Sequence, residues 1–497
     1  MNTDTIIHFS KVWAAYRIDP VLQDFNWHWR RGEQWAILGG NGAGKSAVAH
    51  LMTDTLRPQR GDVLRSPNLL AEADILHLSF ELQRQLIDHD VRFDDSEARD
   101  DAFDIGTTVR QIILQKHPED ERFASIAKQC HVDHILNRGI RFVSTGESRK
   151  TLLARALLNP PKILILDNPF EGLDRQSQDE LKVLINELLC SPLKVLLLIK
   201  QADEIPKNTD HVLWLEQGKI KASGTRDSVI TQAEQADTSI NIGRLPAASE
   251  RHYLVDKRQP LLAFKRVNVS YGPQPILNDI NWTLNWGQHC CISGPNGAGK
   301  STLLSLLSGD NHKAYGQDIS LFGRPRGSGE SIWELKKKFG IVSTQLQLNH
   351  VGRTRVVEVI ASGLYDSVGL YKTCSGKDKK IAMDWLRVMG LDDIANHFFN
   401  QISFGQQRLA MLARAMVKSP LILILDEPCI GLDRPHRDLI LALTDKIAAR
   451  GDCHILYVSH SANEMPHCIN QQLDLVPHSG GGYTGCVTQH NAVGRGQ

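Results

Sequence analysis

Two short apolar runs in the chain end abruptly at polar side chains. Residues 422–425 (Ile-Leu-Ile-Leu) are followed by Asp426 and Glu427, and residues 163–166 repeat the same four letters before Asp167 and Asn168. A buried parallel strand reads as a continuous apolar run, and open α/β sheets bind ligands beyond the carboxyl ends of such strands. Adjacent carboxylates are costly to desolvate unless a cation or a polar substrate meets them. The pattern therefore predicts an α/β sheet with a ligand site where these strands end.

A helical pattern precedes the run at residues 422–425. Apolar residues at Leu409, Leu412, Ala413 and Met416 follow residues 403–406 (Ser-Phe-Gly-Gln) with helical spacing. A serine and a glycine at a helix start leave a hydroxyl and bare backbone N–H groups facing outward, which is an arrangement that binds anions. This stretch therefore combines an anion-binding helix start with a strand end suited to a metal ion and a base.

Two glycine-rich loops each follow an apolar strand and precede a helical pattern. Residues 39–46 read Gly-Gly-Asn-Gly-Ala-Gly-Lys-Ser, and residues 294–302 read Gly-Pro-Asn-Gly-Ala-Gly-Lys-Ser-Thr. In such loops glycines permit the tight turn and backbone N–H groups cradle phosphates. The lysine supplies positive charge and the serine hydroxyl holds Mg²⁺. Both loops are predicted to bind nucleotide phosphates.

The motifs occur twice at a nearly constant offset. Lys45 and Lys300 are 255 positions apart, and the same offset relates Tyr16 to Tyr271; Ser144 and Ser403 are 259 positions apart. The offset of 259 also relates Asp167 to Asp426 and Asp174 to Asp433. A repeat of this length indicates duplication of a whole domain rather than a solenoid unit.

Residues 403–406, the run 422–427 and the loop 294–302 together resemble the signature motif, Walker B strand and Walker A loop of ATP-binding cassette (ABC) ATPases. The resemblance implies an α/β fold with two P-loop NTPase domains of ABC type in tandem. Each domain would have an α/β core and a helical subdomain. We place the first domain at residues 1–240, a linker at 241–258 and the second domain at 259–497.

The resemblance also implies bound ATP and Mg²⁺ and assigns a role to each matching position. In the second cassette Glu427 would polarise the attacking water, His460 would contact the γ-phosphate, and Gln345 would touch Mg²⁺ and report to a partner. The metal set is Ser46, Asp167, Ser301, Gln345 and Asp426. The ATP-binding set, in which the two tyrosines would stack on adenine, is Tyr16, Gly39, Gly40, Asn41, Gly42, Ala43, Gly44, Lys45, Ser46, Tyr271, Gly294, Pro295, Asn296, Gly297, Ala298, Gly299, Lys300, Ser301, Thr302, Ser144, Gly146, Ser403, Gly405 and Gln406.

The first half departs from the family pattern at three catalytic positions. Glu81 stands in place of the metal-contacting glutamine, Asn168 in place of the base, and Lys200 in place of the switch histidine. An amide cannot accept a proton from attacking water. Glu147 also replaces the amide at the end of the first signature motif. We therefore expect the first half to bind ATP and to hydrolyse it poorly.

ABC cassettes pair head to tail, and each ATP lies between one phosphate loop and the partner's signature motif. With both cassettes on one chain, the resemblance implies that this pairing is intramolecular. One site would join Lys45, Asp167 and Asn168 to residues 403–406. The other would join Lys300, Glu427 and His460 to residues 144–147, where Glu147 would place an acid near the triphosphate.

Composition narrows the partners. The chain has 57 Lys and Arg against 56 Asp and Glu, which gives a net charge of +1. It therefore has no overall electrostatic field that would attract nucleic acid. No apolar run approaches the ~20 residues needed to span a bilayer, and the N-terminus lacks a basic signal region. Nine scattered cysteines without a CxxC pair are typical of reduced core thiols. We expect a cytoplasmic protein whose contact with the inner membrane is peripheral, through integral membrane permease subunits.

Within the ABC family, the degenerate first half and residues 327–336 resemble the bacterial ModF-like tandem ATPases, which are associated with molybdate transport and are also described as photorepair proteins. Nothing in the chain is an oxyanion receptor, so the molybdate role comes from resemblance alone. Two alternatives are a translation-factor-like tandem ABC ATPase acting on ribosomes and the ATPase of a sugar importer. The short, mild connector and Asn168 argue against the ribosomal alternative.

Overall fold

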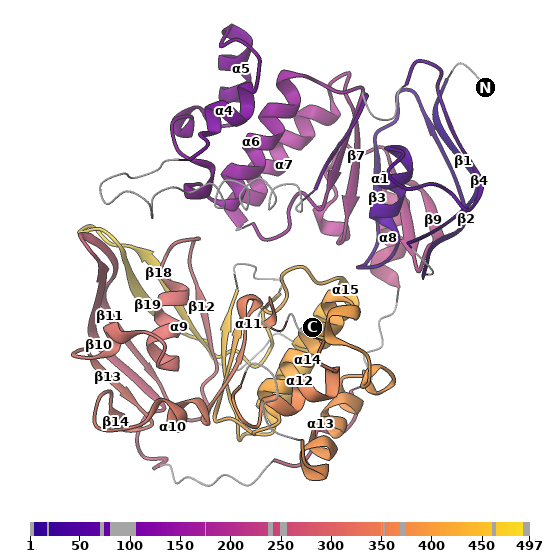
Figure 1. The fold of residues 1–497 in the computed structure, drawn as a ribbon. Helices are drawn as coiled ribbons and strands as arrows, with labels where there is room; N and C mark the ends of the chain where they lie inside the picture. The colour runs from indigo at the N-terminus through magenta and orange to yellow at the C-terminus, as the bar shows by residue number, and fades with distance from the viewer. Residues whose placement is uncertain are drawn as a thin grey trace. The chain divides into compact units, whose positions relative to one another are not determined.

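The computed structural model describes residues 4–16, 19–69, 74–79, 106–173, 175–236, 242–248, 256–348, 350, 353–367, 374–459 and 464–490. The chain divides into two compact units, Met1–Thr238 and Ser239–Gln497 (Figure 1). Each unit is described here by itself. The positions of the predicted domain boundaries stay a prediction.

The first unit combines an antiparallel sheet with a mainly parallel one. The antiparallel sheet has the order β2-β1-β4, and the second sheet has the order β5-β6-β7-β3-β8-β9, in which the last strand pairs antiparallel. The strands are β1 (Thr5–Tyr16), β2 (Asp19–Arg30), β3 (Trp35–Leu38), β4 (Arg60–Arg65), β5 (Ile75–Leu78), β6 (Ile163–Asp167), β7 (Lys194–Ile199), β8 (His211–Glu216) and β9 (Lys219–Thr225). The helices are α1 (Lys45–Met52), α4 (Val109–Leu114), α5 (Glu121–Gln129), α6 (Thr145–Leu158), α7 (Arg175–Leu189) and α8 (Arg226–Gln235).

The second unit repeats this plan in one continuous sheet, with the order β14-β13-β10-β11-β19-β18-β12-β17-β16-β15. Its strands are β10 (Leu262–Tyr271), β11 (Gln274–Leu284), β12 (Cys290–Ser293), β13 (Asp318–Leu321), β14 (Arg324–Pro325), β15 (Phe339–Val342), β16 (Ile422–Asp426), β17 (His454–Val458), β18 (Gln471–Pro477) and β19 (Tyr483–Gln489). Its helices are α9 (Lys300–Ser308), α10 (Ile332–Lys336), α11 (Thr344–Leu348), α12 (Val356–Ser362), α13 (Gly376–Val388), α14 (Phe404–Met416) and α15 (Arg434–Ala449). The order β15-β16-β17-β12-β18-β19 matches β5-β6-β7-β3-β8-β9 strand for strand, as a duplication requires.

The parallel strands are buried on both faces. Along β6, Ile163 and Ile165 pack with the antiparallel sheet and α1, while Leu164 and Leu166 pack with α6 and α7 on the other face. β16 alternates in the same way between the two cores of its own unit. Successive side chains of a strand point to opposite faces, so these continuous apolar runs fill two cores at once. Polar side chains of β6 and β16 are therefore confined to the carboxyl ends of these two strands.

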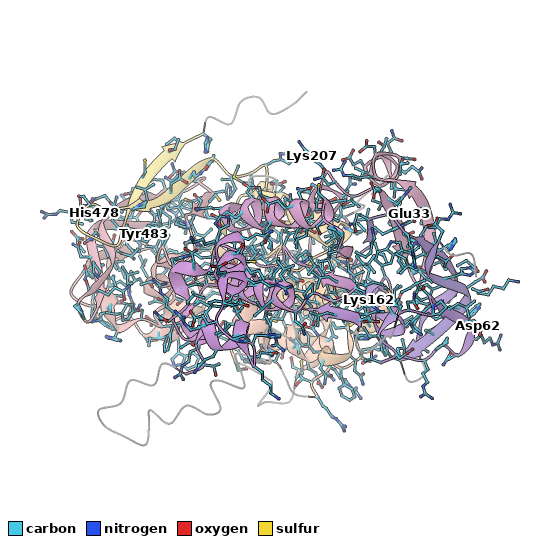
Figure 2. The ribbon with its side chains drawn as sticks, turned by 90° about the horizontal axis from the view of Figure 1, so that it is seen from above. Glu33, Asp62, Lys162, Lys207, His478 and Tyr483 are labelled. Atoms are coloured by element: carbon cyan, nitrogen blue, oxygen red, sulfur yellow. The ribbon has the colours of Figure 1, made fainter. Side chains whose placement is uncertain are left out.

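The helix that follows each phosphate loop is held between two layers. Val48 and Leu51 of α1 belong to the same core as Phe9 and Trp27, and the Trp27 ring stacks on that of Trp29 with centroids 5.7 Å apart. Charged side chains such as Asp62 and Lys207 lie on the exposed surface (Figure 2). The aromatic layer thus fixes the start of α1 against the parallel sheet.

Part of the predicted linker is fastened to the second unit. Ile242 and Leu245 pack against the core beside α14 and α15. The Lys446 ammonium donates to the carbonyl oxygens of Ile242 (2.7 Å) and Gly243 (2.9 Å). Arg450 donates to the carbonyl oxygen of Pro246 at 3.1 Å. Residues 242–248 therefore belong structurally to the second unit, although their composition gives no sign of it.

Two expectations from composition can be compared with the structure. The nine cysteines are free thiols; five of them, at positions 130, 290, 291, 429 and 453, are buried, as expected for reduced core cysteines. None of the helices in the described part of the chain combines the length and apolarity needed to cross a membrane.

Candidate functional site

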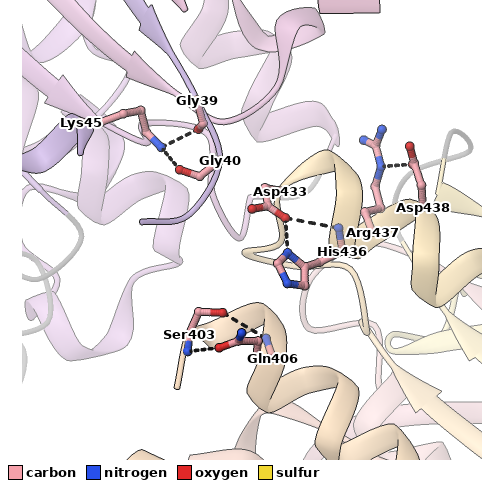
Figure 3. Close-up of polar contacts among 9 residues, drawn as sticks. All are labelled: Gly39, Gly40, Lys45, Ser403, Gln406, Asp433, His436, Arg437 and Asp438. Atoms are coloured by element: carbon pink, nitrogen blue, oxygen red, sulfur yellow. Dashed lines mark hydrogen bonds and ion pairs between the residues drawn. The ribbon is translucent and has the colours of Figure 1, made fainter. Parts of the chain in front are cut away.

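The first phosphate loop runs from the end of β3 into α1. Gly44 adopts φ +104°, and a Cβ there would meet the Val21 carbonyl oxygen at 2.5 Å, so the turn requires glycine. The buried Lys45 ammonium donates to the carbonyl oxygens of Gly39 (2.6 Å) and Gly40 (2.9 Å) (Figure 3). The lysine is folded back over its own loop, which places its charge at the centre of the turn.

The second phosphate loop has the same construction. Gly299 adopts φ +89° before α9, and the Lys300 ammonium donates to the carbonyl oxygens of Gly294 and Pro295, each at 2.9 Å. A turn with positive-φ glycines, a helix N-terminus and a central ammonium fits the triphosphate of a nucleotide. Both predicted loops therefore have the shape and charge that this ligand needs.

At the first site the predicted metal residues meet. The Ser46 hydroxyl donates to Oδ2 of Asp167, the last residue of β6, at 2.9 Å. Burial alone would raise the pKa of this carboxyl, but hydrogen bonds from His77 and Ser46 and the charge of Lys45 lower it below its ordinary value. An ionised carboxylate beside a serine hydroxyl fits Mg²⁺ bound with a nucleotide. In the second unit β12 and β16 both flank β17 in parallel, which brings Ser301 and Asp426 to the same edge of the sheet.

The residues after the two aspartates share one backbone conformation. Asn168 has φ +47° and Glu427 has φ +49°. Their N–H groups donate to equivalent carbonyl oxygens, of Leu198 at 2.9 Å and of Val458 at 3.1 Å. The chain therefore presents an amide at one site and a carboxylate at the other from the same backbone position. The Asn168 amide donates to Oδ1 of Asp167 at 2.8 Å.

Lys200 follows β7 and forms an ion pair with Glu171, Nζ to Oε1 2.8 Å. Nearby, burial lowers the pKa of Arg149 to about 10, although Glu171 and Glu204 oppose the shift. Burial, together with the charge of Asp203, raises the pKa of Glu204 to about 7. Lys200 thus lies within a charged cluster next to the first site. The predicted residues Glu81, Asp174 and His460 lie outside the described residues.

Both signature motifs cap a helix in the same way. Ser403 is the N-cap of α14, where its hydroxyl accepts from the N–H of Gln406 (3.2 Å) and the Gln406 side chain accepts from the N–H of Ser403 (2.9 Å) (Figure 3). At α6, Ser144 and Glu147 make the same reciprocal pair at 3.2 and 2.7 Å. Glu147 is therefore a capping-box residue, so its carboxylate serves the fold of the motif. Gly146 and Gly405 occupy the first turns.

The predicted adenine tyrosines close β1 and β10, each next to the phosphate-loop helix. The Tyr16 hydroxyl contacts Nδ1 of His50 in α1, and the Tyr271 hydroxyl accepts from Asn311 at 3.0 Å. Both rings are partly exposed, at 41% and 47%. Their stacking role stays a prediction.

The sequence pattern of the ABC transporter family matches residues 22–171 and 277–430 of the chain. The chain belongs to the ABC transporter family. The ABC transporter ATP-binding protein ModF of Escherichia coli K12 is 38% identical over 458 residues, which cover 90% of this chain and 92% of that protein. An uncharacterized ABC transporter ATP-binding protein of Schizosaccharomyces pombe is 27% identical over 469 residues, covering 91% and 94%. The resemblance inferred from the motifs is thereby confirmed, and the chain is a tandem ABC ATPase.

The fold agrees with this family. The archaeal ribosome recycling factor, solved with an archaeal ribosomal stalk protein, has a TM-score of 0.61 at 18% identity, covering 96% of this chain and 89% of that one. At this identity the likeness concerns the fold alone. The predicted fold class, two ABC-type nucleotide-binding domains in tandem, is confirmed.

Motif reasoning missed three residues of the ABC cassettes, a pair of equivalent arginines and one histidine. Arg408 is fully buried and donates to the Thr344 hydroxyl (2.8 Å) and to the Glu427 carbonyl oxygen (3.5 Å). Its counterpart Arg149, 259 positions earlier, donates to the Pro169 carbonyl oxygen. That offset was the signal that could have revealed the pair. The third missed residue, His77, lies with Nε2 3.3 Å from the Asp167 carboxylate and belongs to no motif.

The raised pKa of Glu204 predicts a pH dependence of stability. Because the folded state binds this proton more tightly than the unfolded state, the contribution is full below the ordinary pKa of 4.5 and is lost as pH rises through about 7. Glu204→Gln keeps an acceptor for the Gln201 N–H and removes the charge. We expect hydrogen exchange of β7 to slow on the order of tenfold at pH 8 and to change little at pH 5, since one pKa unit is about 1.4 kcal/mol. Equal effects at both pH values would contradict the assignment.

Proposed function

We propose that this ABC ATPase binds two molecules of Mg·ATP and hydrolyses ATP mainly at the second cassette. The observation that carries the proposal is the shared conformation of Asn168 and Glu427, which differ in chemistry and not in position. Glu427 can accept a proton from attacking water, whereas the Asn168 amide cannot. The asymmetry therefore lies in one functional group.

Two further features support a slow first site. Lys200, at the position of the switch histidine, is engaged in an ion pair with Glu171. Asn168 donates to Asp167, which ties its amide to the metal carboxylate. Neither the Asn168 amide nor the paired Lys200 supplies a base for the attacking water. In this proposal the first site is a binding site whose occupancy supports the second.

The second cassette supplies the residues for phosphoryl transfer. Lys300 offsets the charge of the phosphates, Ser301 and Asp426 hold Mg²⁺, and the metal, when bound, stabilises negative charge on the transferring group. Glu427 polarises the attacking water. Buried Arg408 donates to the Glu427 backbone carbonyl and so positions the carboxylate. Gln345, exposed in the first turn of α11, completes the metal set, and His460 is proposed to contact the γ-phosphate.

We propose that the two cassettes pair head to tail within the chain, as ABC cassettes do. The capping boxes at Ser144 and Ser403 support this, because each leaves a helix N-terminus with its serine in place for a phosphate. The Glu147 carboxylate adds negative charge at one of the two motifs. Pairing through that motif is therefore expected to be weaker than pairing through Ser403.

The proposed biological setting is transport, with integral membrane permease subunits as partners and a peripheral position at the cytoplasmic face of the inner membrane. A groove of about 230 Å³ beside Gln345 supports a docking site; Lys336, Phe339, Asp366 and Lys418 line it. Its charges of both signs suit a polar partner segment. Molybdate as the associated solute rests on the resemblance to ModF-like proteins, whose E. coli representative is 38% identical.

Nucleotide stoichiometry tests the first part of the proposal. Equilibrium binding of a non-hydrolysable ATP analogue with Mg²⁺ should give two molecules per chain. Lys45→Ala and Lys300→Ala should each remove one, because each ammonium is the central charge of its loop. Lys207→Ala, at an exposed surface position, is the matched control and should retain two. A stoichiometry of one in the unmodified chain would sink the proposal.

Catalytic asymmetry is tested by steady-state phosphate release. Loss of a positioned base costs ~10²- to 10⁴-fold, so Glu427→Gln should abolish most turnover while ATP stays bound. Asn168→Ala should change turnover little, and Asn168→Glu alone should not create a fast first site, because Glu81 and Lys200 remain. More than about half the activity in Glu427→Gln would show that this residue is not the working base, since even the lower limit of the expected loss is ~10²-fold.

Cell fractionation tests the setting. We expect the chain in the membrane fraction, released by high salt or alkaline washing, since the described helices include none that could span a bilayer. Affinity purification from membrane and from ribosome fractions should recover a permease from the first and little from the second. Retention that requires detergent, or enrichment on ribosomes, would contradict the transport proposal.

A further inference from the structure

The two cassettes also differ at a strand position beside the predicted metal carboxylate. His77 in β5 pairs with Ile165, and Ile341 in β15 pairs with Ile424, so the strand registers make His77 and Ile341 equivalent. The His77 imidazole reaches the metal carboxylate, Nε2 to Asp167 Oδ2 3.3 Å. The same carboxylate oxygen accepts from the Ser46 hydroxyl at 2.9 Å. An imidazole nitrogen therefore joins the serine and the aspartate at the metal corner of the first cassette, where the second cassette has an isoleucine at the equivalent strand position.

A second imidazole lies behind the first. The rings of His50 and His77 meet edge to face, with centroids 5.6 Å apart, and the His50 Nδ1 contacts the Tyr16 hydroxyl. The equivalent position in the second cassette is Ser305, 255 residues later. His77 is mostly buried, with 15% of its side chain exposed, so its ring orientation is fixed by this packing. Such support holds a metal-ligating imidazole in place.

We propose that the metal site of the first cassette, where His77 Nε2 lies beside Ser46 and Asp167, takes Mg²⁺ with ATP but prefers a divalent first-row transition-metal ion, whereas the second cassette has no such preference. Imidazole nitrogen suits Zn²⁺, Ni²⁺ and Fe²⁺, while Mg²⁺ prefers oxygen ligands in an octahedron. The proposal rests on nucleotide binding at the first loop, as set out in the proposed function.

The metal is expected to arrive with the nucleotide. Among the described residues, no group of three or more His, Cys, Asp and Glu side chains comes together to hold an ion by itself. His77 and Asp167 supply two ligands of this kind and the Ser46 hydroxyl a third, so phosphate oxygens are needed to complete a coordination shell. A metal–ATP complex therefore fits, and a permanent structural metal does not.

Metal selectivity is measured on two variants of the full chain. Lys300→Ala leaves the first phosphate loop intact, and Lys45→Ala leaves the second phosphate loop intact. Each is titrated with a non-hydrolysable ATP analogue in Ni²⁺ or in Mg²⁺. The ratio of the two affinities should favour Ni²⁺ about tenfold more strongly at the first site than at the second, the lower end of the effect of losing one supporting contact at a metal site. His77→Ile, which installs the residue of the second cassette, should remove this difference.

Pulsed electron paramagnetic resonance of bound Mn²⁺ identifies the ligand directly. Coupling to a histidine nitrogen, recognised by isotopic labelling of histidine, is expected with Lys300→Ala and should vanish on adding His77→Ile or the polar His77→Gln. Adding Ile341→His to the Lys45→Ala chain should create the coupling at the second site. This reverse variant keeps the test decisive if the first-site variants fold poorly.

Two negative results differ in meaning. Nucleotide binding at the first site with no histidine coupling and no metal preference would overturn the metal assignment and leave His77 as a positioning residue for Asp167. Absence of nucleotide from the Lys300→Ala chain with either metal would overturn two-site ATP binding, and this proposal with it.

Discussion

Burial of both faces of the central strands determines where this protein can carry chemistry. β6 and β16 each separate two apolar cores, so every side chain within them is committed to packing. The desolvation cost of a charged side chain falls only where each strand leaves the cores, at Asp167 and Asp426. The parallel arrangement brings the ends of β3, β6 and β7, and of their counterparts, to one edge of each sheet. The apolar interior excludes polar groups, so they collect at this edge. The phosphate loop, the predicted metal carboxylate and the predicted catalytic position therefore lie close together there.

The duplication shows how such an edge can change its chemistry without changing its fold. Asn168 and Glu427 have nearly the same φ and the same backbone hydrogen bond. Arg149 donates to the carbonyl oxygen of Asn168, and Arg408 donates to that of Glu427. Substitution at the edge costs little packing energy, because the side chain lies outside both cores. The backbone support is retained in the first cassette although an amide replaces the carboxylate. A degenerate site can therefore stay a well-formed binding site.

The sequence predicted the phosphate loops, the strand ends and the duplication, because each depends on local rules: glycine for positive φ, continuous apolar runs for buried strands, and a constant offset between copies. It did not predict the place of His77, because a single histidine in a strand of four residues has no pattern, and only the register of β5 on β6 brings it to Asp167. Nor did it predict that Glu147 caps α6, since the charge of that residue suggested only repulsion. Contacts between segments distant in sequence are determined by packing. The hydrophobic periodicity of the sequence does not predict them.

The fastening of residues 242–248 to α15 shortens the free connection between the two cassettes. From the end of α8 at Gln235 to Ile242 the chain advances seven residues. At ~3.6 Å per residue, these span at most about 25 Å, whatever their conformation. A linker over the whole of residues 241–258 would allow more than twice that reach. A shorter tether raises the effective concentration of one cassette for the other. It therefore favours encounters between cassettes of the same chain over encounters between chains.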